Sequence, residues 1–297
     1  VVGLGTGSSA GWLGRVPSIE RVDVMELESV ILRVAKDCAK VNEDVLQNPK
    51  VHIQLNDARE GLLTSRQRYD LVFSEPSNPY RAGISSLYTV EYYRAVAARL
   101  ADDGVFAQWI QAYDVDPFAV GTAMTTIHAV FPHITVWRTT NGDLLLIGQK
   151  VARPFQFDQM RALLATEPFA SATLAAWETS SLEGVLAHFV GDSAFVDRVV
   201  ASQAGAVNED DQNLLEFAFA RNVGTRATMD RDIARVAHRL HHDMPQGTGA
   251  FDTSLILEEV LLNRGSGILA QLGESRLSPE LALYVAALSA FEREEWP

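Results

Sequence analysis

The sequence predicts a doubly wound, Rossmann-like α/β fold, and two patterns lead to this expectation. In residues 1–150, short β-rich segments alternate with segments of helical periodicity, an order typical of a parallel sheet with helices on both faces. The last two β-rich segments are separated by a turn that contains Asn141 and Gly142. Because Asn-Gly between apolar runs is a strong hairpin signal, we expect the last strand to run antiparallel to the others.

Each predicted element rests on a local pattern of apolar residues. The predicted strands are residues 22–26, 51–55, 69–74, 104–110, 134–138 and 144–149, and the predicted helices are residues 29–42, 89–100 and 117–130. Only Val1 and Val2 precede the first glycine, although a strand ordinarily has about four to eight residues. We therefore expect a truncated N-terminus that lacks most of the first strand. The predicted order of strands and helices, with an antiparallel last strand, is similar to that of class I S-adenosylmethionine-dependent methyltransferase-like folds.

The character of the chain changes after residue 150. Residues 151–154 resemble a linker, and the segments that follow have helical patterns rich in Ala, Leu and Phe. We divide the chain into a nucleotide-binding catalytic core (1–150), a helical completion of that core (151–224) and a helical tail (225–297). The tail is interrupted near residues 245–249, and paired helices of a repeat type stay possible although their signature is absent.

Composition narrows the class of protein and of partner. With 47% hydrophobic and 21% charged residues, the 297-residue chain has an ordinary globular composition. Its formal net charge of −13 disfavours nucleic acid and favours a small cationic substrate. An apolar run of about 18 residues, as a membrane span needs, is absent. We expect no membrane contact by this fragment and a cytoplasmic location, while the full-length protein can be attached through a region outside it.

A glycine turn opens the chain and predicts a nucleotide site. Gly3, Gly5 and Gly7, with Thr6 between the last two, precede a helical segment, so the backbone can approach a ligand and the helix can present free N–H groups. Such a turn also fits nicotinamide dinucleotides. Glu26 ends the next strand, where a carboxylate can accept hydrogen bonds from ribose hydroxyls.

The third predicted strand is followed by a second candidate ligand of the nucleoside. Asp57 and Ala58 lie at its carboxyl end. The Asp57 carboxylate there can accept a hydrogen bond from the exocyclic amine of adenine, or it can cap the helix that begins after it. Both interpretations stay open at this point.

The segment after the fourth predicted strand has the most specific motif. Residues 69–79 are Y-D-L-V-F-S-E-P-S-N-P, and residues 87–93 are L-Y-T-V-E-Y-Y. Together they resemble the loop and helix of the spermidine synthase (polyamine aminopropyltransferase) family. Residues 208–211, N-E-D-D, are similar to a stretch of the bacterial spermidine-synthase-like domains that are sometimes fused to a transporter-like membrane region. The resemblance covers residues 1–221.

The resemblance implies a role for each matched residue. Glu75 corresponds to the catalytic Asp that acts as a base, and Glu26 and Asp57-Ala58 to the ribose and adenine ligands. The glycine turn then contacts the methionine-derived end of the co-substrate. The implied substrate-binding residues are Asn78, Gln108 and Asp210. The family uses decarboxylated S-adenosylmethionine as co-substrate, and its members commonly form homodimers.

Two departures from the family pattern affect specificity. Thr6 replaces an acidic residue, which removes a charge that would repel the carboxylate of S-adenosylmethionine. Asn78 replaces a second carboxylate, so that affinity for a polyamine should fall. Asp210 and Asp211 can compensate if their loop covers the site.

These departures leave three functions open. The first is a transferase that alkylates an amine acceptor with decarboxylated S-adenosylmethionine or S-adenosylmethionine, as in polyamine biosynthesis. The second is an S-adenosylmethionine-dependent small-molecule methyltransferase, and the third a non-catalytic nucleotide-sensing or interaction domain. We expect no metal: His238, His241 and His242 have helical spacing, but no Cys or acidic residue is spaced to complete a metal-binding set, so they are expected on a solvated helix face.

Overall fold

The computed structural model describes residues 1–79, 81, 83–139, 142–203, 205–224 and 229–264. The chain divides into two compact units. The first comprises Val1–Phe155 and Phe189–Gln246, and the second Gln156–His188 and the described part of Gly247–Pro297. The predicted boundaries at residues 150 and 224 differ from this division, because segments after residue 188 return to the first unit. The end of the predicted tail, residues 265–297, lies outside the described residues.

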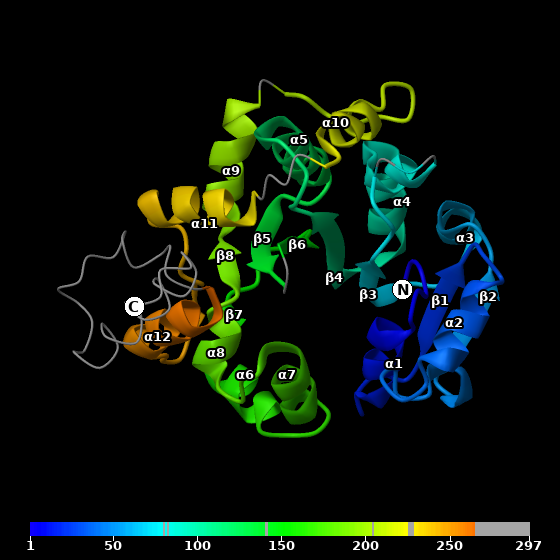
Figure 1. Ribbon diagram of the computed structural model, residues 1–297, viewed down its shortest axis with the longest axis horizontal. Helices are drawn as coiled ribbons and strands as arrows, with labels where there is room; N and C mark the ends of the chain where they lie inside the picture. Colours follow the sequence, from blue (N-terminus) through cyan, green and yellow to red (C-terminus); the bar gives the residue numbers. More distant parts are fainter. Residues whose placement is uncertain (80, 82, 140–141, 204, 225–228, 265–297) are drawn as a thin grey trace, which may run out of the picture. The chain divides into compact units, whose positions relative to one another are not determined.

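The sheet of the first unit has parallel strands on one side and a hairpin on the other (Figure 1). β1 (Val22–Glu26) pairs in parallel with β2 (Val51–Leu55), and β3 (Tyr69–Ser74) pairs in parallel with β4 (Leu100–Gln111). Val2 forms parallel bridges to Met25 and Ser74. Residues 1–3 therefore occupy the central strand position between β1 and β3.

The hairpin confirms the predicted antiparallel strand. β6 (Asp143–Gln149) is antiparallel to β4, and β5 (His133–Arg138) is antiparallel to β6. The strand order of the larger sheet is β3-β4-β6-β5-β8. The doubly wound α/β fold with an antiparallel closing strand is therefore confirmed, although residues 140 and 141 of the predicted turn lie outside the described residues.

Strand β8 (Phe189–Gly191) was not predicted. It pairs antiparallel with β5 in a region for which we expected only helices. Its three residues are too few to show an alternating pattern. Its first residue, Phe189, packs against Trp137 of β5, with ring centroids 5.2 Å apart, and these two residues are distant in the sequence. Only tertiary packing identifies this strand.

The helices near the glycine turn are short. They are α1 (Ser8–Arg15), α2 (Ile31–Asp37), the 3-10 segment η1 (Val45–Gln47) and α3 (Ala58–Thr64). The predicted helix 29–42 ends early, at Asp37. The buried Asn42 side chain donates hydrogen bonds of 2.7 Å to the carbonyl oxygens of Ala35 and Thr6, which directs the chain back toward the glycine turn instead of continuing the helix.

The core of the first unit lies between the sheet and the helices that follow β3. These helices are η2 (Ile84–Tyr88), α4 (Val90–Arg99), α5 (Pro117–His128), α9 (Ser193–Ser202), α10 (Leu214–Asn222) and α11 (Asp230–Arg239). Thr89 and Asp116 cap α4 and α5 with side-chain oxygens. Phe106 stacks on Phe131 with ring centroids 5.2 Å apart, and each such fully buried ring contributes roughly 1.5–3 kcal/mol.

The second unit is mainly helical. It contains α6 (Phe157–Leu164), α7 (Phe169–Trp177), α8 (Leu182–Leu186) and α12 (Thr253–Arg264), and the two-residue strands β7 (Phe155–Gln156) and β9 (Gly247–Thr248) pair beside them. Arg161 forms a 3.0 Å ion pair with Glu183. Within the described residues, we find no helix with the length and apolar character needed to cross a membrane.

Candidate functional site

One edge of the sheet gathers most of the predicted site residues. Parallel strands end at the same edge, where open α/β sheets bind ligands. The residues that lie at the ends of successive strands are Gly3 after Val2, Glu26 in β1, Asp57 after β2, Glu75 after β3 and Gln111 in β4. Because β6 is antiparallel, its first residue, Asp143, lies at this edge too.

Two glycines of the turn are required by geometry. Gly3 has φ of 88° and Gly7 φ of 86°, in the left-handed region that favours glycine. A Cβ atom on Gly7 would lie 2.7 Å from the side chain of Val45, and one on Gly3 would lie 3.1 Å from the carbonyl oxygen of Glu75. The turn is therefore closely packed against η1 and against the loop that follows β3.

Glu26 orients the glycine turn. Its Oε2 accepts a 2.8 Å hydrogen bond from the backbone N–H of Leu4, and its Oε1 accepts a 2.9 Å bond from the N–H of Glu28. A carboxylate offers about four acceptor positions, so positions on both oxygens stay open for ribose hydroxyls. The predicted ribose contact is compatible with this arrangement and stays a prediction.

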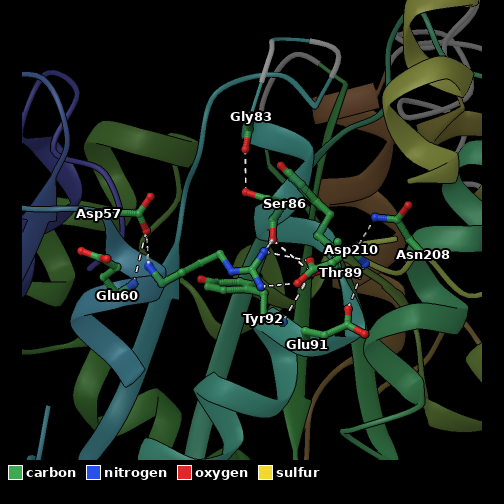
Figure 2. A network of polar contacts seen from close by, with 11 residues as sticks. Asp57, Glu60, Gly83, Ser86, Thr89, Glu91, Tyr92, Asn208 and Asp210 are labelled. Carbon is green, nitrogen blue, oxygen red and sulfur yellow. Dashed lines mark hydrogen bonds and ion pairs between the residues drawn. The ribbon is translucent and has the colours of Figure 1, made fainter. Parts of the chain in front are cut away.

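Asp57 acts as a helix cap in the structure. Its Oδ1 accepts hydrogen bonds from the N–H groups of Arg59, at 2.7 Å, and Glu60, at 3.3 Å, and Figure 2 shows this cap at the start of α3. Both bonds use the same oxygen. The cap interpretation is therefore confirmed, while the adenine contact predicted for Asp57 and the adjacent Ala58 stays a prediction for the second oxygen.

Glu75 lies directly after β3 and is exposed. Its Oε2 accepts a 2.6 Å hydrogen bond from the Oγ of Ser9 in the first turn of α1. Its backbone N–H donates to the carbonyl oxygen of Val2 at 3.2 Å. The carboxylate is thus directed toward the glycine turn by a hydroxyl that the sequence motif did not single out.

The amide of Asn78 belongs to a polar cluster at the end of β4. Its Nδ2 donates to Oε1 of Gln111 and, at 3.2 Å, to the hydroxyl of Tyr113. The Gln111 Nε2 in turn donates to the carbonyl oxygen of Tyr113 at 2.6 Å. The Asn78 amide can donate both of these hydrogen bonds, whereas an ionised carboxylate at position 78 could donate neither.

The Gln108 side chain lies on the face of β4 opposite to that of Gln111. The side chain of Gln108 is fully buried, and its Nε2 donates to the carbonyl oxygen of Trp109 at 2.9 Å. Trp109 and Gln111 point to the opposite face, because side chains alternate along a strand. Substrate binding by Gln108 stays a prediction, and the structure brings Gln111 rather than Gln108 together with Asn78.

Asp210 forms an ion pair instead of facing an open site. Its two oxygens accept hydrogen bonds of 2.8 and 2.5 Å from the guanidinium of Arg59 in α3. Hydrogen bonding to Arg59 lowers the pKa of Asp210, and the same bond raises the pKa of Arg59. An amine would have to displace Arg59 to use this carboxylate, so the substrate role predicted for Asp210 stays a prediction.

Asn208 anchors the segment that carries Asp210. Its side chain is fully buried, donates to the carbonyl oxygen of Tyr88 at 3.1 Å and accepts from the N–H of Leu215 at 3.1 Å. The N–H of Asp210 donates to the Glu91 carboxylate at 3.1 Å. Figure 2 shows Asp210 and Asn208 beside the start of α4. The motif at 208–211 thus fastens this segment to α4.

Asp143 is a site residue that the sequence analysis missed. It lies opposite Gln111 in the β4–β6 ladder. Burial raises the pKa of its carboxyl, the Trp109 side chain lowers it by hydrogen bonding, and the negative charges of Glu75 and Asp230 raise it further. Its position in a predicted turn, next to residues 140–141, hid it among ordinary turn-forming residues.

The histidines near the end of the first unit have acidic neighbours. Nδ1 of His238 lies 2.6 Å from Asp243, and Nδ1 of His242 lies 3.2 Å from Asp192. Each of these two histidines therefore has one carboxylate beside it. Even so, the described part of the chain contains no group of three side chains placed to hold a metal ion.

Comparison with known proteins finds a family match for the part of the chain that carries the glycine turn, Glu26 and Glu75. Residues 1–140 match the family model described as the spermine/spermidine synthase domain. This part of the chain is therefore similar to members of that family. The resemblance stated from the motif at residues 69–79 is thereby confirmed for this part of the chain.

Relatives of the domain are distant, and each match covers less than half of the relative. The polyamine aminopropyltransferase of Alkaliphilus oremlandii is 29% identical over 105 residues, which cover 35% of this chain and 37% of the relative. That of Thermoanaerobacter sp. is 27% identical over 134 residues, covering 45% of this chain and 47% of the relative. The chain thus spans less than half the length of these relatives.

A solved structure supports the fold. A spermidine synthase in complex with the transition-state analogue AdoDATO is similar with a TM-score of 0.50 and 19% identity, and the match covers 68% of both chains. At this identity the similarity shows the fold. It agrees with the doubly wound sheet and antiparallel closing strand described above.

Proposed function

We propose that this protein is a spermidine-synthase-like transferase that alkylates a small cationic amine. The co-substrate is decarboxylated S-adenosylmethionine, and the reaction class is that of polyamine biosynthesis. One observation carries the proposal: the exposed Glu75 carboxylate lies at the carboxyl edge of the sheet and is hydrogen-bonded to Ser9 beside the glycine turn. A base there can act where an amine meets a nucleoside sulfonium.

The nucleoside half of the co-substrate fits the residues around the turn. Glu26 has acceptor positions left for ribose hydroxyls, and Asp57 has a second oxygen for the adenine amine. Gly3, Gly5 and Gly7 let the backbone approach the sulfur-bearing chain, with Thr6 between them.

The transfer is a displacement at carbon. Glu75 takes a proton from the acceptor ammonium, and the lone pair of the neutral nitrogen attacks the methylene carbon next to the sulfonium. The N–C bond forms while the C–S bond breaks with its electron pair going to sulfur. The sulfonium becomes the neutral thioether 5′-methylthioadenosine, and the nitrogen carries the aminopropyl group.

A methyltransferase is the second candidate, and Thr6 favours it. The Thr6 hydroxyl lies 3.1 Å from the Ser8 hydroxyl. Neutral groups therefore occupy a position where the resemblance implies an acidic residue. S-adenosylmethionine with its carboxylate is then not repelled. In that case the methyl carbon is attacked and S-adenosylhomocysteine is released.

Product analysis separates these functions. The full-length protein is incubated with 1,4-diaminobutane and either decarboxylated S-adenosylmethionine or S-adenosylmethionine, and the nucleoside product is identified by mass spectrometry. Release of 5′-methylthioadenosine with an aminopropylated amine supports the proposal. Release of S-adenosylhomocysteine with a methylated amine favours the second candidate, and nucleoside binding without turnover favours a sensing domain.

The predicted partners follow from the same proposal. A small cationic amine as substrate is supported by the acidic edge of the sheet and by the net charge of −13. The predicted homodimer and the expectation that nucleic acid and membranes are not partners stay predictions.

A further inference from the structure

Asp143 belongs to the same polar cluster as the loop after β3. It pairs with Gln111 in the antiparallel register of β6 and β4, and directly opposite residues project from the same face of a sheet. Gln111 accepts the hydrogen bond of Asn78. The start of β6 and the loop after β3 therefore meet at the end of β4.

The carboxylate of Asp143 has an unused hydrogen-bonding position. Its Oδ1 is buried and has no hydrogen-bond partner among the described residues. Among the described residues, Asp143 forms no ion pair with Lys, Arg or His. The nearby Asp230, whose negative charge acts on Asp143, is by contrast paired with Arg138 at 3.4 Å. A buried carboxylate oxygen without a partner is costly, and a ligand that donates hydrogen bonds would remove that cost.

Glu75 and Asp143 lie close enough to influence each other. The charge of Glu75 is one cause of the raised pKa of the Asp143 carboxyl. Two carboxylates that repel each other are both stabilised by a cation between or beside them. The half-buried ring of Trp109, on the same face as Gln111, adds a surface on which an alkylammonium can lie.

We infer that Asp143 is the residue that binds the ammonium group of the acceptor, and that it supplies the negative charge that Asn78 lacks. This inference rests on the proposed function, in which Glu75 takes the proton from the attacking nitrogen. The second, non-reacting ammonium of a diamine is held by Asp143, with Gln111 and Tyr113 beside it. The acceptor is then an aliphatic diamine or polyamine rather than a monoamine.

Charge removal at position 143 tests the inference. Binding of 1,4-diaminobutane and of butylamine is measured by calorimetry with the full-length protein saturated with 5′-methylthioadenosine. Asp143→Asn keeps the shape and removes the charge, Asp143→Glu keeps the charge, and Glu20→Gln removes an exposed charge near the opposite end of β1. We expect Asp143→Asn to weaken diamine binding at least about tenfold, and Asp143→Glu and Glu20→Gln to keep most of the affinity.

The outcomes separate this inference from the proposed function. Asp143 has the inferred role if its Asn variant loses diamine affinity but keeps the affinity of the wild type for 5′-methylthioadenosine. Unchanged diamine binding in that variant overturns the role and leaves the proposed function standing. Equal loss of diamine and nucleoside binding means a structural role and also overturns it. If the wild-type protein with bound nucleoside binds neither amine, both the inference and the proposed function are wrong.

Discussion

Glu75 is the residue on which catalysis depends in the proposed function. Glu75→Gln keeps the side-chain shape but cannot accept a proton at neutral pH. We expect the transfer rate to fall roughly 10²- to 10⁴-fold, while the dissociation constant for 5′-methylthioadenosine changes little. Single-turnover kinetics and calorimetry measure the two quantities, with Glu20→Gln as the control. A variant with the wild-type rate would exclude Glu75 as the base.

Ser9 is a positioning residue for that carboxylate. Its hydroxyl donates a 2.6 Å hydrogen bond to Oε2 of Glu75, so Ser9→Ala should leave the carboxylate free to rotate. We expect kcat to fall roughly tenfold through lost orientation with little change in the KM for the nucleoside co-substrate. Ser9→Thr, which keeps the hydroxyl, should restore the rate. Equal effects of the two substitutions would argue for a packing role instead.

Glu26 combines a structural and a binding role. Glu26→Gln turns one acceptor oxygen into an amide donor, which cannot accept both the N–H of Leu4 and that of Glu28. Because hydrogen bonds to charged groups contribute about 1.5–3 kcal/mol each, we expect nucleoside binding to weaken by at least about tenfold. Calorimetry with 5′-methylthioadenosine measures the change. Full affinity in the variant would mean that ribose is held elsewhere.

Helix α3 and the segment before α10 are joined by the Arg59–Asp210 pair. The pair is partly exposed, with 23% and 37% of the two side chains accessible, so solvent screening limits its contribution to about 1 kcal/mol or less. The pKa of Asp210 is lowered in the folded state. Its contribution is therefore fully present above the unfolded pKa, and it is lost as the pH falls through the lower folded value.

Because the stabilising contribution of Asp210 is lost at low pH, the effect of Asp210→Asn on stability should depend on pH. The variant should be slightly less stable than the wild type at neutral pH. The difference should shrink when the pH falls below about 4, where Asp210 of the unfolded wild-type chain is protonated. Urea unfolding at several pH values measures this difference in the free energy of unfolding. A difference that grows toward low pH would contradict the assignment of the lowered pKa.

The Asn208 side chain holds the same segment to η2 and α10 more strongly. Asn208→Ala removes the donor to Tyr88 and the acceptor for Leu215 from a fully buried position. Unsatisfied buried groups cost about 1–3 kcal/mol each, so we expect the free energy of unfolding to fall by roughly 2–4 kcal/mol. The exposed neighbour Glu209, changed to Ala, is the control in urea unfolding. Equal stability of the two variants would show that the segment is held otherwise.

At the scale of the molecule, the net charge of −13 attracts a cationic acceptor. Salt screens such long-range attraction, with a Debye length of about 10 Å at 0.1 M. We expect the KM for 1,4-diaminobutane to rise with ionic strength. The inhibition constant of 5′-methylthioadenosine, which is uncharged and occupies the nucleoside site, should change much less. Steady-state kinetics at several salt concentrations tests this, and salt-independent diamine kinetics would contradict it.

Much of the fold follows from local patterns in the sequence. The alternating strands and helices, the glycine turn and the apolar segment 69–74 each depend on neighbouring residues, because backbone geometry and strand periodicity act over short range. The same holds for the caps at Asp57, Thr89 and Asp116. These signals were enough to predict the antiparallel closing strand and the edge of the sheet at which Glu26 and Glu75 lie.

Tertiary structure decided what surrounds those residues. The early end of α2 depends on a hydrogen bond from Asn42, and Asp210 meets Arg59 across many intervening residues. Asp143 gains its place in the site only because β6 runs antiparallel to β4 and brings it opposite Gln111. The sequence by itself determined the sheet and its ligand-binding edge, because those signals are local. The partners of each charged group were decided by the packing of distant segments, which local patterns do not encode.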